Sequence, residues 1–393
     1  MSLLLSIIYL IFSLRNIRLG VLFIIQFLIL QVITDIFFEA TALEKWVKYI
    51  VIGLNLFRVI RLDKNALSTY VFLVYIIYST LTLIFNTTDL AYSGRNYMVM
   101  FLSFSALFIE LKVTTKEILK SLFYSSLLIC IYLICASLYG SDDLLNSYSD
   151  NFAGGVFSTT GANLLPLFVW IAMYYLLYLE LSITSRISAY ITLIICLILL
   201  LIIMRRTPLI LTIFGLVYLL KSRISLKRLA VMVFGLGIVA LIIYNTPLGS
   251  LFENQLNARS DSLSIEGLAK EGRLLEPYLV RDYFLNHATI GDWVYGRDGF
   301  STRWFGELYF SGRRSIHSDV FSILCSNGVI GLLLFFTLYL SRISFKRQSK
   351  LYLLLLLLSF TTMLTGRLTT SLTFALPFFL LLQGHINSVY NET

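Results

Sequence analysis

The sequence predicts an all-α polytopic membrane protein, a bundle of about 12–13 transmembrane helices with one long, partly helical external loop. Two observations support this fold class. Of the 393 residues, 58% are hydrophobic and only 13% are charged, whereas about a quarter of the residues in soluble domains are charged. Apolar runs of roughly 15 to 22 residues recur from end to end, about the length at which a helix crosses a ~30 Å hydrocarbon layer. These runs lack the alternation of barrel strands.

The positive charges give the expected orientation of the helices. The formal net charge is +9, and the basic residues gather in short connections between apolar runs, where the positive-inside rule places them in the cytoplasm. These connections are residues 58–64, 110–120, 221–228 and 341–350, whereas the acidic connection 139–161 and the long segment 245–316 fall on the opposite side. The charge excess therefore reflects membrane topology, and a nucleic-acid partner is not expected.

The number of spans depends on the first apolar run, residues 2–14. It resembles a signal-peptide core, but no basic segment precedes it and no small-residue cleavage site follows, so we expect it to be retained. The run is short for a span, and the basic sequence RNIR at 15–18 favours the cytoplasm. Both twelve and thirteen spans are consistent with this pattern.

The cysteines and the known catalytic motifs give no sign of a metal or another cofactor. All four cysteines, Cys130, Cys135, Cys196 and Cys325, lie inside apolar runs, away from any histidine or carboxylate at ligand spacing. We expect them to pack in the bundle. Glycine-rich phosphate loops, a Ser-His-Asp triad with its elbow, and zincin or deaminase motifs do not occur in the sequence.

The chain divides by composition into residues 1–244, 245–316 and 317–393. The first and last parts are series of apolar runs, and the middle part has the composition of a soluble protein. A loop of this length usually carries function. We expect one helix in it, with Pro277 as its first residue and an apolar stripe of Leu275, Leu279 and Tyr283 lying on the membrane surface.

Arg205 and Arg206 stand at the expected external end of an apolar run, where the positive-inside rule does not place arginines. Thr207 is the expected N-cap and Pro208 the first helical residue, and a helix N-terminus favours a bound anion. Two interpretations remain open. The pair contacts lipid head groups, or it forms a phosphate site, because guanidinium groups bind phosphate oxygens bidentately.

Arg273 lies inside the external loop, and Arg281 follows two turns later in the expected helix. Carboxylates at Glu271, Glu276 and Asp282 make a surface ion pair an equally good interpretation of Arg273.

His317, beside Arg313 and Arg314, stands where polar sequence gives way to an apolar helix. Ser318 is expected to cap this helix, which would begin at Asp319. Neighbouring arginines and a helix N-terminus favour the neutral imidazole, which can accept a proton. A purely structural histidine at the membrane interface is the alternative.

Four segments in order resemble the O-antigen polymerase and O-antigen ligase superfamily of bacterial inner-membrane glycosyltransferases. The sequence IHSDVFSILCSNGVIGLLLFF resembles its histidine, hydrophobic helix and Gly-(apolar)2-Gly signature, here His317, Gly328 and Gly331. GGVFSTTGANLLPLF resembles its Gly-x-Phe…Asn segment, and RRTPLILTIFGLVYLL its arginine at the start of a span. The long loop, with Arg273 before GDWVYGRDGF, completes the pattern, which covers the chain from about residue 154 onward.

The resemblance implies sugar transfer on lipid carriers at the periplasmic face, with neither metal nor cofactor. The donor would be a glycan linked through pyrophosphate to undecaprenol, and the acceptor a sugar hydroxyl. Arg273 with Arg205 or Arg206 would bind and stabilise the leaving pyrophosphate, and His317 would take the acceptor proton in an inverting displacement. Which of the two adjacent arginines matches the family's position stays open. Further cations for a second head group are Arg281, Arg297, Arg303, Arg313 and Arg314.

The sequence His-Ser-Asp at residues 317–319 is more similar to the polymerase branch, for which a chain-length regulator protein is an expected partner beside the membrane lipids. The first alternative is O-antigen ligase, which would transfer finished polymer to lipid A-core. The second is a lipid-linked oligosaccharide flippase. Transporters place charged residues near mid-membrane, and here Asp35 and Arg367 are the main charged residues inside or near spans.

Overall fold

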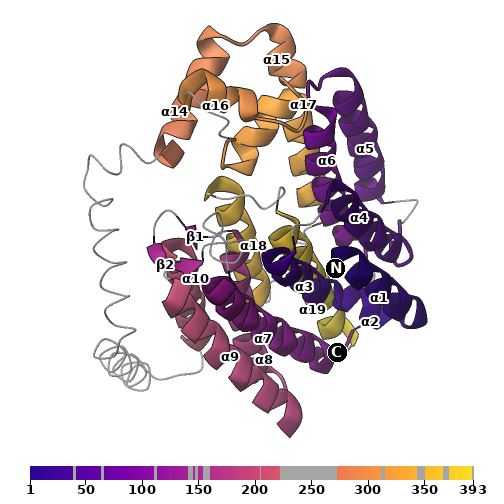
Figure 1. Cartoon of the computed structure of the whole chain (residues 1–393), viewed down its shortest axis with the longest axis vertical. Coiled ribbons are helices and arrows are strands. Elements are labelled where there is room, and N and C mark those ends of the chain that lie inside the picture. Colours follow the sequence, from indigo (N-terminus) through magenta and orange to yellow (C-terminus); the bar gives the residue numbers. More distant parts are fainter. Residues whose placement is uncertain are drawn as a thin grey trace.

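The computed structural model describes residues 1–391 apart from a set of short segments and one longer stretch. Outside the description lie residues 39–40, 63–65, 110–112, 140–144, 147–148, 154–159, 204, 222–271, 311–314, 343–349 and 366–370. The described chain is a bundle of helices with one short strand pair (Figure 1). The predicted helical bundle is therefore confirmed for these residues, and the strand pair in the acidic connection is a feature that the sequence analysis did not predict.

The elements follow the apolar runs of the sequence. Before the external loop they are α1 (Ser2–Arg15), α2 (Ile17–Leu22), α3 (Ile24–Phe37), α4 (Ala42–Phe57), α5 (Leu67–Phe85), α6 (Leu90–Ser105), the 3-10 turn Ala106–Phe108, α7 (Thr115–Tyr139), the antiparallel strands β1 (Leu145–Asn146) and β2 (Ser149–Ala153), the 3-10 turn Thr160–Asn163, α8 (Leu164–Tyr178), α9 (Ile183–Ile203) and α10 (Arg206–Leu220). After it come α14 (Gly272–Asn286), α15 (Ile290–Tyr295), α16 (Arg303–Phe310), α17 (Asp319–Arg342), α18 (Lys350–Thr365) and α19 (Leu372–Asn391).

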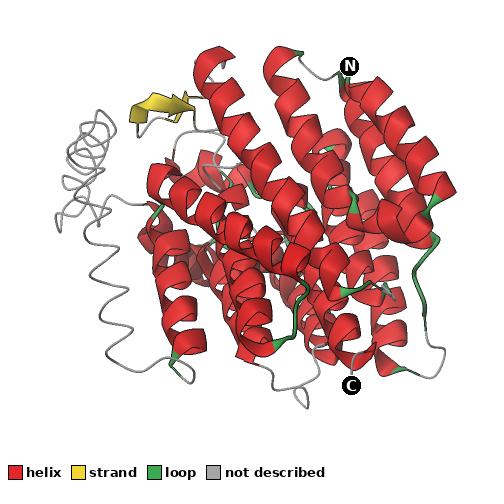
Figure 2. Cartoon of the chain, turned by 90° about the horizontal axis from the view of Figure 1, so that it is seen from below, coloured by secondary structure: helices red, strands yellow, loops and turns green. Residues whose placement is uncertain are grey.

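Five helical segments within the described residues are long and apolar enough to cross a membrane. They are Leu67–Phe85, Thr115–Ala136, Gly161–Tyr178, Ile183–Ile203 and Asp319–Ser341, and shorter apolar helices run beside them (Figure 2). The helix α1 buries its polar side chains and exposes its apolar ones. The buried residues of α1 are Ser2, Ser6, Tyr9 and Ser13, while Leu4, Ile7, Ile8, Ile11 and Leu14 are exposed. Helices surrounded by lipid have this arrangement, in which small and polar residues face other helices and large apolar residues face outward.

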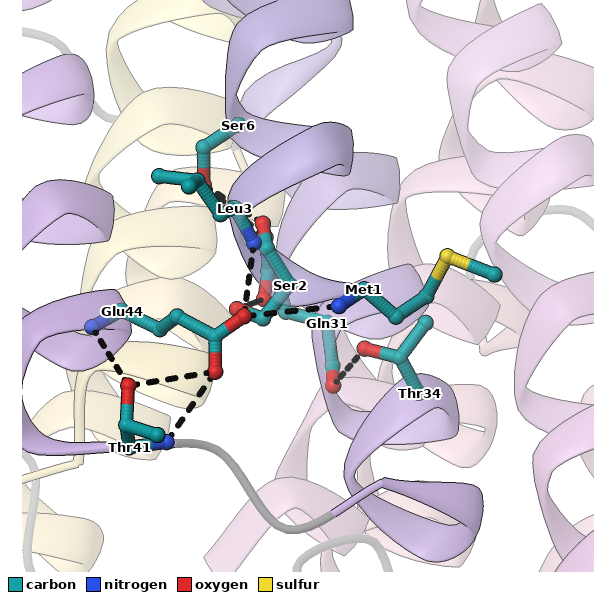
Figure 3. A network of polar contacts seen from close by, with 8 residues as sticks. All are labelled: Met1, Ser2, Leu3, Ser6, Gln31, Thr34, Thr41 and Glu44. Atoms are coloured by element: carbon teal, nitrogen blue, oxygen red, sulfur yellow. Dashed lines mark hydrogen bonds and ion pairs between the residues drawn. The ribbon is translucent and has the colours of Figure 1, made fainter.

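A buried glutamine links the first helix to the third. In α3, Gln31 is 1% exposed and donates to the carbonyl of Ser2 (3.0 Å) and to the hydroxyl of Ser6 (3.2 Å), and the Ser2 hydroxyl donates back to its side-chain oxygen (Figure 3). Nearby, Glu44 at the start of α4 accepts the backbone N–H of Leu3 (3.2 Å). Polar contacts of this kind fix the first apolar run against the bundle.

Replacing Gln31 by leucine is expected to lower the free energy of unfolding by about 1–2 kcal/mol, because Ser2 and Ser6 lose an interhelical partner in an apolar environment. Thermal unfolding of the detergent-solubilised protein measures the effect. Ile8→Ala, on the exposed side of α1, is the matched control and should leave the midpoint unchanged. Equal midpoints for Gln31→Leu and wild type would show that α1 is held by packing alone.

Two of the four predicted basic connections lie at one end of the bundle in their described parts, whereas 222–228 and 343–349 lie outside the described residues. Arg18 forms an ion pair with Glu117 (2.8 Å), and the backbone N–H of Arg61 donates to the carbonyl of Phe108 (3.0 Å). These contacts place the segment 15–18 beside residues 113–120, and residues 58–62 beside the end of the preceding 3-10 turn at Phe108, which are the described parts of the predicted cytoplasmic connections 58–64 and 110–120 and their border. The grouping is the one that the positive-inside rule requires of a membrane protein.

At the other end, residues 272–310 and 315–318 form a cap around the start of α17 (Figure 1, top). The cap has its own core of buried apolar side chains, which are Val280, Tyr283, Phe284, Phe305, Ile316 and Cys325. It is bound to the turn between α5 and α6, where Asn86 donates to the carbonyl of Gly296 (2.8 Å) and Thr88 donates its backbone N–H (2.7 Å) and its hydroxyl (2.9 Å) to Asp298. The predicted external loop is thus an ordered layer over this end of the bundle in its described part.

Two predictions about the loop helix are wrong. The helix α14 begins at Gly272, so Pro277 lies inside it rather than at its first position. Proline is tolerated there at the loss of one backbone bond, the one that its missing N–H would make to the carbonyl of Arg273. The predicted membrane-surface stripe is also wrong, because Tyr283 is fully buried in the cap core while Leu275 is 37% exposed. The face that α14 buries carries Glu276, Val280, Tyr283 and Phe284.

The helix α17 is interrupted at Gly328, whose φ is +66° and ψ −173°. The interruption lets the end of α15 approach the backbone of α17, since the N–H of Arg297 donates to the carbonyl of Cys325 (2.8 Å). A Cβ atom on Gly328 would overlap the carbonyl of Val294 and lie 2.6 Å from the nitrogen of Tyr295. The glycine therefore permits the close approach that joins the cap to the membrane-length helix.

Candidate functional site

His317 lies two residues before the first residue of α17, Asp319, and is held by a buried carboxylate of the cap. Its ring atom Nδ1 is 2.6 Å from Oε1 of Glu276, and its backbone N–H donates to Oε2 of the same residue at 3.0 Å. The Glu276 side chain is 3% exposed, while that of His317 is 28% exposed. One carboxylate thus receives both N–H groups of a histidine that itself stays accessible, which fixes the ring and satisfies both carboxylate oxygens.

The carboxylate determines which ring nitrogen is available for chemistry. When Glu276 is ionised its oxygens only accept hydrogen bonds, and Nδ1 is then the donor in this pair. A neutral imidazole with its proton on Nδ1 carries its lone pair on Nε2. No residue within the described part of the chain is hydrogen-bonded to Nε2 of His317. The pair therefore has the arrangement of an oriented general base.

Backbone and hydroxyl contacts on both sides hold the residues next to His317. The N–H of Ile316 donates to the hydroxyl of Thr302 (3.1 Å), and the hydroxyl of Ser318 donates to the carbonyl of Met363 in α18 (3.2 Å). The prediction that α17 begins at Asp319 is confirmed. Ser318 precedes that first residue as predicted, and its hydroxyl connects α17 to α18. His317 is thus fixed between the cap and two membrane helices.

The turn after α15 is clamped by hydrogen bonds in a backbone conformation that few residues adopt. Asp298 and Phe300 have φ values of +58° and +61°, in the left-handed region. Such residues cost free energy and persist where surrounding contacts over-determine them. Here the Asp298 carboxylate accepts from Thr88, and the carbonyl of Phe300 accepts from Asn96 of α6 (2.9 Å). The turn is therefore a rigid support for the site.

Of the cap arginines whose side chains are described, two stack on aromatic rings and one lies in solvent. Arg297 stacks on the ring of Trp304 at 4.9 Å, and Arg303 on that of Tyr92 at 3.5 Å. Arg281 is exposed on α14, five positions after Glu276 and hence about 140° around the helix. None of the three contacts His317 in the described structure. They remain cations of the same surface rather than partners of the histidine.

The position of α10 corrects a prediction about Arg205 and Arg206. The helix begins at Arg206 with Arg205 as its N-cap residue, so the predicted cap Thr207 and first residue Pro208 each lie inside the first turn. Proline fits there because the N–H groups of a first turn have no partners in the helix. Arg205 is half-buried. The side chains of Arg206 and Arg273, and all of Arg313, Arg314 and Arg367, lie outside the described residues.

Asp282 is a second charged group of α14 with several partners. It accepts hydrogen bonds from the Tyr309 hydroxyl (2.9 Å) and from Asn286 (2.7 Å), and His287 lies 3.6 Å away. These bonds, that of Tyr309 first, hold the pKa of Asp282 below its usual value. The contact joins α16 to α14, so Asp282 supports the cap. The predicted surface ion pair of Arg273 is not tested, because the side chain of Arg273 lies outside the described residues.

Glu276 is the residue that the sequence analysis missed as a site residue. A signal was present, because Glu276, Val280, Tyr283 and Phe284 share one helical face at spacings of four, three and one residues. A carboxylate in an otherwise apolar stripe needs a hydrogen-bonding partner when it is buried.

The described residues contain no group of three His, Cys, Asp or Glu side chains that could hold a metal ion. Cys196 and Cys325 are buried, and Cys130 and Cys135 are half-buried.

The fold and the site define a helical bundle with membrane-length helices and a cap that holds a buried-carboxylate–histidine pair. No family model and no curated protein matches this chain.

Proposed function

We propose that the protein is a membrane glycosyltransferase of the O-antigen polymerase type, acting at the periplasmic face of the bacterial inner membrane. The observation that supports this most is the oriented histidine, with Nδ1 of His317 on the buried carboxylate of Glu276 at the start of a membrane-length helix. A base at this position reaches sugars of lipid-linked substrates whose tails remain in the bilayer. The family resemblance of residues 316–336 supports the same reaction.

In the proposed reaction, Nε2 of His317 removes the proton of an acceptor sugar hydroxyl. The hydroxyl oxygen forms a bond to the anomeric carbon of the donor while the bond from that carbon to the pyrophosphate oxygen breaks. The electron pair of the broken bond leaves with the lipid pyrophosphate, and attack from the opposite side inverts the anomeric centre. Glu276 stabilises the imidazolium that results, as a buried carboxylate does in other histidine-based sites.

The leaving group is the second element of the proposal. A lipid diphosphate carries negative charge that guanidinium groups bind bidentately, so the proposal requires no metal. We assign this role to Arg273 with Arg205 or Arg206. Arg273 precedes Glu276 by three positions in α14, which places it one turn away along the same helix. The other cations, for a second head group, are Arg281, Arg297, Arg303, Arg313 and Arg314. A chain-length regulator protein is a proposed partner.

The proposed topology has thirteen crossings with the cap outside. From the grouping of residues 15–18 with the connections 58–64 and 110–120, α1 crosses toward the cytoplasm, and each later apolar helix reverses direction. In this proposed topology, the described helices α1, α3 to α10 and α17 to α19 cross the membrane. One further crossing is assigned to the apolar run before residue 245, which lies outside the described residues.

The lipopolysaccharide of cells lacking the gene tests the proposal. The deletion strain is expected to show lipid A-core bearing a single repeat unit, and wild type should restore the ladder of longer chains. His317→Ala at equal membrane abundance should fail to restore it, because loss of a general base costs about 10²- to 10⁴-fold in rate.

His287→Ala is the matched control, since His287 is an exposed histidine of the same cap and should restore the ladder. A ladder restored by His317→Ala would refute the base assignment. Bare core with polymer accumulating on the lipid carrier would identify a ligase. Repeat units trapped on the cytoplasmic side would indicate a flippase.

A further inference from the structure

Three cations that lie far apart in the sequence come together at the capped end of the bundle. Lys48 lies in the first half of α4, Arg95 in the first half of α6 and Arg303 at the start of α16. The first halves of α4 and α6 are at the end opposite Arg18 and Glu117. The positive-inside rule gives no reason for lysine and arginine there, so they require another explanation.

Two tyrosines arrange these cations in a row along α6. Arg303 stacks on the ring of Tyr92 at 3.5 Å. One turn further along α6, the Nε of Arg95 donates to the hydroxyl of Tyr49 (3.2 Å). The ammonium of Lys48 lies 5.6 Å from the ring centre of the same Tyr49, which is 4% exposed. Tyrosine contacts fix the cations without neutralising their charge.

Nearby carboxylates balance this charge only in part. Asp89 lies 3.8 Å from Arg303 and is half exposed, and Asp35 of α3 acts electrostatically on Lys48 without an ion-pair contact. Lys45 adds a further positive charge, and Glu44 is engaged with the backbone N–H groups of Thr41 and Leu3. Within the described residues, no carboxylate lies within 4.0 Å of Lys48 or Arg95. Lys48 is half-buried and Arg95 is exposed, so an anion could reach both of these incompletely balanced charges.

We propose that Lys48, Arg95 and Arg303 bind the phosphate-bearing head group of an outer-leaflet lipid. Guanidinium groups match phosphate oxygens bidentately, and an ammonium group adds a point charge. Lys48 and Arg95 lie one to two turns inside the ends of their helices, at the depth where basic residues between membrane helices bind lipid head groups. The site uses Lys48 of α4, Arg95 of α6 and Arg303 of α16, and of these only Arg303 is among the cations assigned above to a second substrate head group. It contains neither His317 nor Glu276, and it needs only that the capped end faces the outer leaflet.

Lipid binding to the full-length protein, purified in an uncharged detergent, tests the site. The probes are farnesyl diphosphate, short-chain phosphatidylglycerol and inorganic pyrophosphate, each titrated and followed by native mass spectrometry. Each cation is worth roughly a fivefold change in affinity for an anionic lipid, so Lys48→Gln with Arg95→Gln is expected to weaken lipid binding about 25-fold. Lys116→Gln with Lys120→Gln removes the same charge from exposed positions on α7 and should leave the affinity unchanged.

The three probes separate the sources of the phosphate. If the variant loses affinity for farnesyl diphosphate alone, the ligand is a lipid diphosphate. If it loses affinity for phosphatidylglycerol equally, the ligand is a membrane phospholipid. Two results would overturn the proposal. The first is that pyrophosphate binds as tightly as both lipids. The second is that the variant with Lys48→Gln and Arg95→Gln keeps the wild-type thermal stability and the wild-type affinity for the lipids. His317→Ala should bind all three probes as wild type does, so failure of the transferase proposal would leave this result intact.

Discussion

Replacing Glu276 by glutamine is expected to lower the rate constant of sugar transfer by about 10²- to 10⁴-fold. The carboxylate keeps the proton of His317 on Nδ1, at 2.6 Å. A glutamine amide can instead donate to Nδ1, and the ring proton then moves to Nε2, where the acceptor hydroxyl must be deprotonated. Transfer between lipid-linked repeat units in purified membranes measures kcat, and KM for the acceptor should change little because Glu276 does not contact it in the proposed mechanism.

Two further variants test whether Glu276 acts through orientation. Glu276→Asp keeps the carboxylate but shortens the side chain, so activity should lie between wild type and Glu276→Gln. Glu307→Gln is the matched control, since Glu307 is exposed on α16 of the same cap, and its kcat should equal that of wild type. A Glu276→Gln protein that is folded and has the wild-type kcat would show that the carboxylate has no part in transfer.

Replacing Gly328 by alanine is expected to destabilise the cap by about 2–4 kcal/mol, as overpacking and backbone strain add. The φ of +66° with ψ of −173° is a combination that glycine adopts and alanine avoids. The added methyl group would also overlap the carbonyl of Val294 at the end of α15. Limited proteolysis of the purified protein should cut between α14 and α17 far faster than in wild type, and thermal unfolding should begin at a lower temperature.

Gly291→Ala is the matched control for this prediction. Gly291 lies in α15 itself, and a Cβ atom there would have its nearest neighbour at 3.5 Å, an ordinary contact. Its proteolysis rate should match that of wild type. If the Gly328→Ala protein resists proteolysis as well as the Gly291→Ala protein does, the position of α15 does not depend on the break in α17. The glycines of the Gly-(apolar)2-Gly pattern would then have a different role.

Three features could be predicted from the sequence because they depend on local composition. Apolar runs predicted the helices, since a backbone in an apolar environment must satisfy its hydrogen bonds within the helix. Basic connections predicted which segments share an end, and Arg18 with Glu117 confirms one such grouping. The change from polar to apolar sequence predicted the start of α17 at Asp319. The predicted helix starts at Pro208 and Pro277 were wrong. Proline is tolerated at any position of the first turn, as in α10, and α14 contains Pro277 in its second turn.

The partners of the site could not be predicted, because they come from segments far apart in the chain. Glu276 meets His317 across 41 residues, and Arg303 meets Tyr92 across more than two hundred. From sequence alone, Glu276 was one of three carboxylates equally suited to a surface ion pair with Arg273. Lys48 and Arg95 were not among the site residues that the sequence predicted.

The sequence by itself determined that the chain forms apolar helices joined by basic connections and that a histidine stands at the start of one of them. Only the tertiary structure decided that this histidine is oriented by a buried carboxylate, and that α17 breaks at Gly328 to receive α15. The physical reason is that helix formation and membrane preference are sums over neighbouring residues. The position of a proton on an imidazole ring, by contrast, depends on a single atom brought within hydrogen-bond distance by packing.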